Sequence, residues 1–135
     1  MVAIVELNTV TAEIVDAAMK VHSALGPGLL ESAYKTCLAF ELRRRGLKVE
    51  TEVAVPIVYD GIVIDVGYRM DLLVESQVVV ELKAVSELIP IFKAQLLSHL
   101  KLADKRVGLL INFHVEKLKD GGILRMVNRF QDQTN

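Results

Sequence analysis

The chain has 135 residues, of which 52% are hydrophobic, and its 16 basic and 17 acidic residues leave a formal net charge of −1. This length suits one domain with a real hydrophobic core, so we expect residues 1–135 to fold as a single domain. The apolar residues are dispersed, and no run approaches the roughly 20 residues that a membrane span needs. The near-neutral charge also gives no sign of the general basicity that marks many nucleic-acid-binding domains.

The first ten residues, "MVAIVELNTV", and the single cysteine bear on the cellular compartment. The N-terminal segment has neither a basic leader nor a small-residue cleavage site, so it does not resemble a signal peptide. A lone Cys37 cannot form an internal disulfide, which suits a reducing compartment. We therefore expect a cytoplasmic protein, in which Cys37 is a small buried hydrophobe.

Two helices are expected before residue 46. Apolar residues recur at helical spacing over residues 11–25. The segment "GPG" that follows ends this helix, because glycine can take the left-handed conformation and proline cannot continue a helix. A second apolar stripe runs over residues 29–45, and Gly46 is its natural end.

The middle of the chain is typical of β-structure. Residues 49–59 alternate as in a strand with one face more buried than the other. The dipeptide "DG" then predicts a tight hairpin, with a return strand over residues 62–65. Further strands are expected over residues 68–74 and 78–85, joined by a turn near "ESQ", and the second of them is apolar enough to be central.

A third helix, a buried strand and an edge strand complete the expected order. The helix covers residues 86–102, where Pro90 is acceptable only in the first turn. A strand over residues 107–113 is reached through this helical crossover, so we expect it to run parallel to the preceding strand. An edge strand follows at residues 123–127, and residues 131–135 are expected to fray. The order predicts an α/β fold in which helices flank a mixed sheet.

Charged residues interrupt the apolar strands in "DLLVESQVVVELKAV", residues 71–85. Glu81 and Lys83 are two residues apart in a strand, so their side chains share a face. A two-residue "SQ" loop would place Asp71 on the other face. A three-residue "ESQ" loop would instead place Asp71 directly across from Glu81.

The three-residue loop would bring the carboxylates of Asp71 and Glu81 together, and like charges directly opposite in a sheet repel each other. A cation between Asp71 and Glu81 would remove this cost, and a divalent ion with oxygen ligands is the simplest choice. The backbone carbonyl of Leu82 can add a ligand. Mg²⁺ favours few carboxylates together with water and phosphate, which suits such a site.

Five segments in order carry a family resemblance: "HSALGPGLLESAY", "GYRMDLLVE", "VVELKAV", "AQLLSHLKL" and "GLLINF". The pattern "D…ELK" resembles the PD-(D/E)XK nuclease superfamily, and "GLLESAY" resembles the signature of its GxxExxY proteins. The similarity covers about residues 10–128. It implies a restriction-endonuclease-like core in the order α-β-β-β-α-β.

The resemblance also implies a function and a set of site residues. The function is metal-dependent phosphodiester hydrolysis by an activated water, with DNA as the expected substrate. The implied ligands of Mg²⁺, which Mn²⁺ could replace, are Glu31, Asp71, Glu81 and the carbonyl of Leu82. The implied catalytic residues are Asp71, Glu81, Lys83 and Gln95. Among these, Lys83 would activate the water and stabilise charge on the phosphate, and Gln95 would contact substrate or water.

Two positions depart from the pattern of the superfamily. Met70 stands where a proline precedes the first acid, a change that this diverse superfamily tolerates. His99 stands four residues after Gln95, where related sequences often have tyrosine, so a role that needs a phenol is in doubt. Gln95 and His99 still share a helical face. A chemical role for Tyr34 is left open.

Structural explanations compete with several of these assignments. The acids and the lysine of residues 71–83 could form the solvated face of an edge strand. Glu31 could simply oppose the dipole of its helix. The run "RRR", residues 43–45, could contact phosphate, although a solvated helix end is favoured. His22 is at least as readily a buried structural residue as a site residue.

His114 and Lys119 are further candidates for substrate contact, and neither is favoured. Two other functions also stay open. One is a noncatalytic nucleic-acid-binding or protein-binding module that keeps the nuclease fold, and the other is a metal-dependent hydrolase of another phosphate ester. A homodimer, whose two sites would address two strands, is a further expectation.

Overall fold

The computed structural model describes residues 4–129. The fraying predicted for residues 131–135 lies outside this range. The elements follow in the order α1 (Ile4–Leu25), α2 (Glu31–Arg44), β1 (Val49–Ala54), β2 (Ile57–Tyr59), β3 (Ile62–Ile64), β4 (Arg69–Val74), β5 (Val78–Lys83), α3 (Pro90–Ala103), β6 (Val107–Asn112) and β7 (Ile123–Val127). No helix within these residues is both long and apolar enough to cross a bilayer.

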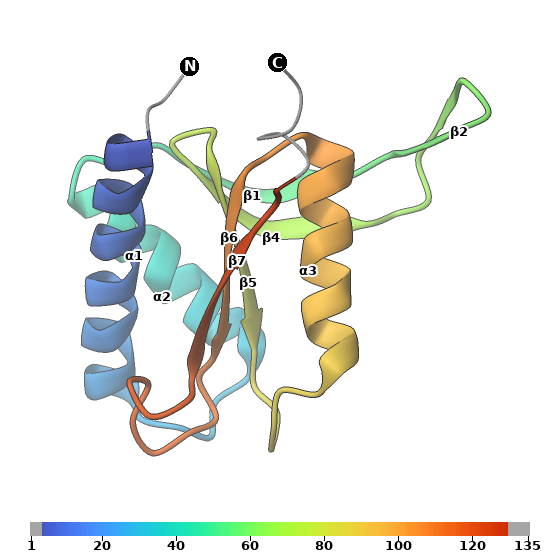
Figure 1. Ribbon diagram of the computed structural model, residues 1–135. Coiled ribbons are helices and arrows are strands. Elements are labelled where there is room, and N and C mark those ends of the chain that lie inside the picture. Colours follow the sequence, from blue (N-terminus) through green and yellow to red (C-terminus); the bar gives the residue numbers. More distant parts are fainter. Residues whose placement is uncertain (1–3, 130–135) are drawn as a thin grey trace.

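Five strands form a mixed sheet in the order β1-β4-β5-β6-β7. β5 and β6 are parallel, and the other neighbours are antiparallel. Helices α1 and α2 cover one face of this sheet, and α3 covers the other (Figure 1). The core from α2 to β6 therefore has the predicted order α-β-β-β-α-β once the β2–β3 hairpin is set aside, and the α/β fold class is confirmed.

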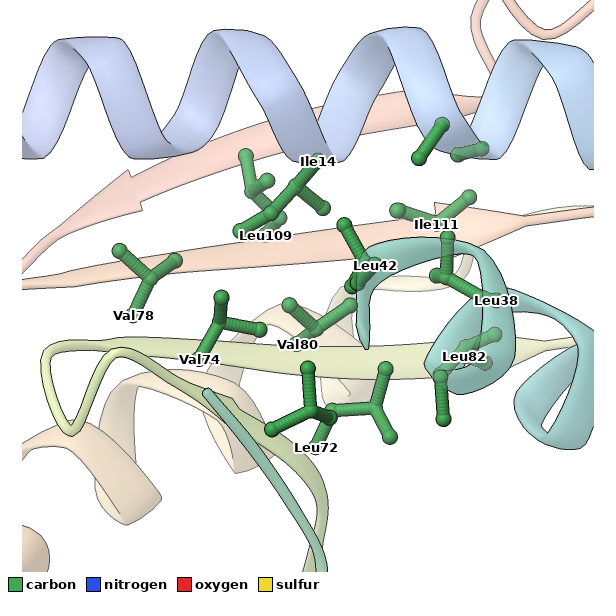
Figure 2. Close-up of a cluster of buried hydrophobic side chains, with 14 of the residues drawn as sticks. Ile14, Leu38, Leu42, Leu72, Val74, Val78, Val80, Leu82, Leu109 and Ile111 are labelled. Atoms are coloured by element: carbon green, nitrogen blue, oxygen red, sulfur yellow. The ribbon is translucent and has the colours of Figure 1, made fainter. Parts of the chain in front are cut away.

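Apolar side chains fill both sides of the sheet. The larger cluster lies between the sheet and the helices α1 and α2, and Figure 2 shows it. Its members include Ile14, Leu38, Leu42, Leu72, Val80 and Leu109. The smaller cluster lies against α3 and includes Val55, Met70, Leu73, Val79, Leu96 and Leu100. Because β5 contributes to both clusters, it is central and buried on both faces, as its apolar run predicts.

The strand predicted over residues 49–59 is broken in the structure. β1 ends at Ala54 and β2 begins at Ile57, and Pro56 lies between them. A proline has no N–H to donate to a ladder, so it interrupts the strand. β2 pairs only with β3, and Figure 1 shows their hairpin projecting from the body of the molecule.

Two helices begin at residues other than those predicted. α1 begins at Ile4 and not at residue 11, because its buried stripe includes Leu7, two turns before Ile14. α3 begins at Pro90 and not at residue 86. Its cap Ile89 is extended, which is the conformation that a following proline favours.

Tyr34 explains the last position of the "GLLESAY" segment. Its hydroxyl donates to the carbonyl oxygen of Gly26 at 2.5 Å and accepts from the N–H of Leu29 at 3.1 Å. Its ring is fully buried and stacks on Phe113, with 4.4 Å between the ring centroids. Tyr34 therefore holds the "GPG" turn in place before α2.

Tyr34→Phe should lower the free energy of unfolding by about 1–2 kcal/mol, because the ring is kept while two hydrogen bonds are lost. Chemical denaturation measures this change. Tyr59→Phe is the matched control, because the Tyr59 side chain is 71% exposed. Equal losses in the two variants would contradict the role given to the Tyr34 hydroxyl.

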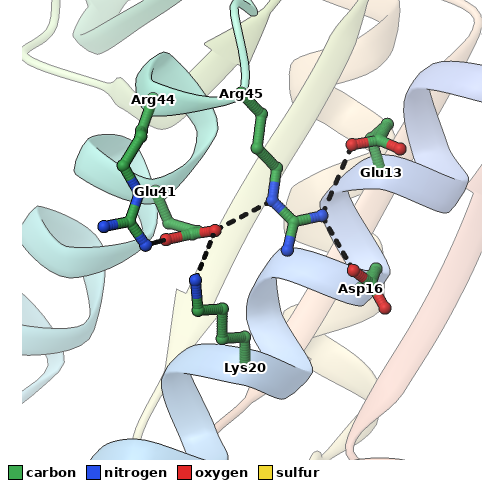
Figure 3. A network of polar contacts seen from close by, with 6 residues as sticks. All are labelled: Glu13, Asp16, Lys20, Glu41, Arg44 and Arg45. Carbon is green, nitrogen blue, oxygen red and sulfur yellow. Dashed lines mark hydrogen bonds and ion pairs between the residues drawn. The ribbon is translucent and has the colours of Figure 1, made fainter.

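The basic run at residues 43–45 is not a free phosphate-binding patch, nor simply a solvated helix end. Arg45 pairs with Glu41 at 2.9 Å and with Asp16 of α1 at 2.8 Å, and Arg44 also pairs with Glu41 (Figure 3). Arg43 donates to a backbone carbonyl oxygen at the start of β1. The run therefore joins α1, α2 and β1.

Glu41 is the buried centre of this network, and it predicts an acid-sensitive contribution to stability. The hydrogen bond from Arg45 is the main cause that lowers the pKa of Glu41 from 4.5 to about 2. A lowered pKa stabilises the folded state above the ordinary value, and this stability is lost as the pH falls from about 4.5 towards 2. Glu41→Gln should unfold more easily than wild type at pH 7, and the difference should shrink over that window. Glu87→Gln, at an exposed site, should show no such convergence.

Candidate active site

The hairpin between β4 and β5 sets the relation between the two acids. Residues 75–77 form the loop, and Val74 pairs with Val78, so the three-residue loop is the one of the two alternatives that the structure adopts. The paired residues extend from Val74 and Val78 as far as Leu72 and Val80. Continuing this register by one residue on each strand places Asp71 across from Glu81.

Each acid lies against the backbone of the neighbouring strand. The N–H of Leu82 donates to Oδ2 of Asp71 at 2.8 Å, and the N–H of Asp71 approaches Oε2 of Glu81 at 3.5 Å. The side chains of Asp71 and Glu81 are 15% and 12% exposed. The sheet therefore holds two largely buried carboxyl groups side by side.

The electrostatics of Asp71 reflect this crowding. The pKa of Asp71 is raised from 3.8 to about 7, mainly by burial of the carboxyl group and also by the nearby Glu81, against the opposing hydrogen bond from the Leu82 N–H. A buried acid with a raised pKa lacks enough positive charge or hydrogen bonding to stabilise its ionised form. The pair is thus suited to a cation that binds both carboxylates.

Lys83 lies near the acids without pairing with them. Alternation along β5 places it on the same face as Glu81. Its ammonium lies over the ring of Phe92 in α3, with Nζ 4.6 Å from the ring centroid. Within residues 4–129, Lys83 forms no ion pair with Asp71 or Glu81.

Helix α3 places His99 against Glu81 and carries Gln95 one turn earlier. Nδ1 of His99 lies 2.8 Å from Oε1 of Glu81, so the imidazole restrains that carboxylate. Gln95, one turn earlier, is exposed. Both residues line a hollow of about 560 Å³, which Tyr68 and Arg69 also line. Asp71, Glu81 and Lys83 do not line this hollow, and His99 is the residue that connects it to Glu81.

Glu31 is the predicted ligand that the structure sets apart. It is the exposed first residue of α2, where an acid opposes the helix dipole. Among residues 4–129, no three or more His, Cys, Asp or Glu side chains are grouped so that they could hold a metal ion. The structure therefore brings Asp71 and Glu81 together without Glu31, whose role as a ligand stays a prediction.

Comparison with known families bears on this geometry. The family model that describes the PD-(D/E)XK nuclease superfamily matches residues 8–126 of the sequence. The chain belongs to this superfamily. A search of curated proteins and a search of solved structures gave no significant match. The match covers both acids, Lys83 and Gln95, whereas membership of the GxxExxY branch of the PD-(D/E)XK superfamily stays a prediction.

The donor set of this PD-(D/E)XK domain fits a hard divalent ion. Asp71 and Glu81 offer carboxylate oxygens, and the backbone carbonyl of Leu82 would be the third donor. Mg²⁺ takes few carboxylates and fills its remaining positions with water and phosphate oxygens. The burial of the two carboxyl groups supplies the physical reason for binding, because an ion would offset their mutual repulsion.

Two partners of the acids were not predicted from the sequence. Lys35 of α2 pairs with Glu52 of β1, and its Nζ lies 3.9 Å from Oδ1 of Asp71. The contact between His99 and Glu81 was also missed. Weak signals existed for both, because Lys35 follows Glu31 by one helical turn and His99 follows Gln95 by one helical turn.

Four other residues discussed from the sequence, His22, His114, Lys119 and Cys37, form no hydrogen bond or ion pair with Asp71 or Glu81 within residues 4–129. Nε2 of the buried His22 lies 2.7 Å from the carbonyl oxygen of Val115, so the structural interpretation of His22 is confirmed. His114 and Lys119 are exposed after β6, and a role in substrate contact stays untested. Cys37 is half-buried against the larger apolar cluster and not fully enclosed.

Proposed function

We propose that this domain is a Mg²⁺-dependent nuclease that hydrolyses phosphodiester bonds in DNA. The observation that carries the proposal is the cross-strand pair of Asp71 and Glu81, two largely buried carboxyl groups that lack sufficient counter-charge. Such a pair costs stability unless a cation binds it. Membership of a nuclease superfamily supports phosphodiester hydrolysis as the use of that cation.

Each residue would have a distinct part in the reaction. Asp71 and Glu81 would hold Mg²⁺ with the carbonyl of Leu82, and Glu31 would complete the ligand set if α2 brings it closer. Mn²⁺ could substitute, because it accepts the same oxygen donors. When bound, the ion supplies a water of lowered pKa and positive charge beside the phosphate.

The remaining side chains would act on substrate and water. Lys83 would swing from the ring of Phe92 towards the phosphate, where its fixed charge stabilises the negative charge that develops. His99 keeps Glu81 oriented through their 2.8 Å contact. Gln95 would contact the substrate or the attacking water from the wall of the hollow on α3.

A second candidate function keeps the fold without catalysis. The position of the Lys83 ammonium over Phe92, with no ion pair to either acid, favours a module that binds nucleic acid or protein. The net charge of −1 suits the protein-binding form of this module better than a form that binds nucleic acid.

We further propose that the chain acts in the cytoplasm as one domain, and that two copies pair when both strands of a duplex are cut.

A cleavage assay tests the proposed function. Supercoiled plasmid, linear duplex, single-stranded and branched DNA, with RNA as a parallel substrate, are incubated with Mg²⁺, with Mn²⁺ or with EDTA. We expect cleavage of DNA with either ion and none with EDTA, and loss of cleavage in Glu81→Ala and Lys83→Ala. Equal inertness of wild type and both variants on every substrate would favour the noncatalytic module.

A further inference from the structure

Lys35 places a positive charge at the edge of the acidic pair. Its side chain is 23% exposed, its ammonium pairs with Glu52, and Nζ lies 3.9 Å from Oδ1 of Asp71. Glu52 stands across from Asp71 in the β1–β4 register, between the pairs Thr51–Leu72 and Val53–Met70. The lysine therefore reaches from α2 over two neighbouring strands to the carboxylate that faces Glu81.

The backbone of β1 has an unusual conformation at Glu52, the partner of Lys35. Glu52 has a φ of +53°, a left-handed conformation that a glutamate in a strand seldom adopts. Glu52 also interrupts the β1–β4 ladder at the position that faces Asp71. The half-exposed Glu52 carboxylate thus gives the Lys35 ammonium an anchor beside the acidic pair.

Lys35 is the only cationic side chain in residues 4–129 that forms an ion pair with Asp71. Glu81 pairs instead with His99 on the opposite side. The Lys35 ammonium therefore supplies part of the counter-charge that a divalent ion would supply at Asp71. Two cations at this carboxylate repel each other, and the repulsion is strong because the carboxylate is largely buried.

We infer that Lys35 is an internal counter-cation that weakens the binding of a divalent ion at Asp71 and Glu81. The ion binds only when the ammonium withdraws from Asp71 to Glu52, which stays its partner. This inference rests on the metal site proposed above. It makes Lys35 a residue that sets the metal concentration at which the domain is loaded.

Metal affinity, measured without any substrate, tests this role. Isothermal titration calorimetry with MgCl₂ and with MnCl₂ is carried out on wild type, Lys35→Met and Lys35→Arg. We expect Lys35→Met to bind about tenfold more tightly, the effect of removing one nearby charge. Lys35→Arg keeps the positive charge, so its affinity for Mg²⁺ and Mn²⁺ should equal that of wild type.

Two further variants keep the outcomes distinct. Lys48→Met removes the same charge from an exposed lysine that contacts Ser76 at the other end of the β4–β5 hairpin, and it should leave the affinity unchanged. Asp71→Asn should abolish binding. If Asp71→Asn abolishes binding but Lys35→Met binds no more tightly than wild type, the role of Lys35 is wrong and the metal site stands. If none of the proteins binds either ion, the metal site itself is wrong, and the inference about Lys35 fails with it.

Discussion

Asp71→Asn should stabilise the metal-free protein at pH 8 by about 2–4 kcal/mol, because it replaces a buried carboxylate with a neutral group of the same shape. The asparagine oxygen can still accept the hydrogen bond from the N–H of Leu82. Few substitutions of a polar residue stabilise a protein by this amount. The expected gain measures what the folded state loses by keeping an ionised acid beside Glu81.

The direction of the pKa shift of Asp71 determines the sign of this change in stability. The pKa of Asp71 rises from an ordinary 3.8 to about 7, so between these values the folded state binds more protons than the unfolded state. The stability of wild type should therefore fall as the pH rises from about 4 to about 7, and then level off. Among the charged groups that act on Asp71, Glu81 raises its pKa and Lys35, which also pairs with Glu52, lowers it.

Denaturant unfolding from pH 4 to pH 8 in EDTA, for wild type and Asp71→Asn, measures the effect. The two proteins should have similar stability at pH 4 and diverge towards pH 8. Mg²⁺ should then stabilise wild type but not the variant, because a ligand stabilises only the state that binds it. A variant less stable than wild type at pH 8 would show that the ionised carboxylate is well compensated in the fold.

Lys83→Met and Glu81→Gln should both lower the cleavage rate by at least about 100-fold, for different reasons. Glu81→Gln removes a ligand and should lose Mg²⁺ binding together with cleavage. Lys83→Met removes a charge that forms no ion pair with the acids, so the Mg²⁺ affinity should stay within about threefold of wild type. Single-turnover cleavage and calorimetry on the same preparations separate the two effects.

Lys93→Met is the matched control for the loss of a lysine near the site. Lys93 lies on α3 and is exposed, so its removal changes the net charge equally without affecting the acids. This variant should cleave as wild type does. Full activity in Lys83→Met would contradict the part given to that lysine, and loss of Mg²⁺ binding in Lys83→Met would make it a structural residue.

The relation between the two acids was predictable from counting along the hairpin. Strand alternation fixes the face of each side chain. A hairpin loop with an odd number of residues places Asp71 opposite Glu81, whereas a loop with an even number places them on opposite faces. Residues 75–77 form that loop. The sequence alone left the two-residue loop open, because the choice depends on the conformation of the turn.

The boundaries of elements were less predictable, for local reasons. Alternation over residues 49–59 predicts one strand, yet the missing N–H of Pro56 separates β1 from β2 and allows the β2–β3 hairpin to leave the sheet. The sequence predicts a helix from residue 86, and the effect of Pro90 on the preceding residue places the start of α3 at that proline instead. In both segments the backbone limits of proline decide where an element begins.

The contacts across the site were the least predictable part. Lys35 and His99 come from helices on opposite faces of the sheet and meet Asp71 and Glu81 only through the packing of those helices. Helical spacing from Glu31 and from Gln95 points to the right face of each helix, but it does not say which acid each side chain contacts. Glu31 shows the reverse case, because its place in a family signature predicts a ligand while the start of α2 leaves it exposed.

The most direct test of the central claim is the position of a bound ion in a crystal of the protein soaked in MnCl₂. Anomalous difference density should show one Mn²⁺ between Asp71 and Glu81, with an oxygen of each carboxylate about 2.1–2.2 Å away. Lys35 should then lie farther from Asp71 than its present 3.9 Å. An ion bound elsewhere, or no ion between these two carboxylates at saturating MnCl₂, would contradict the account.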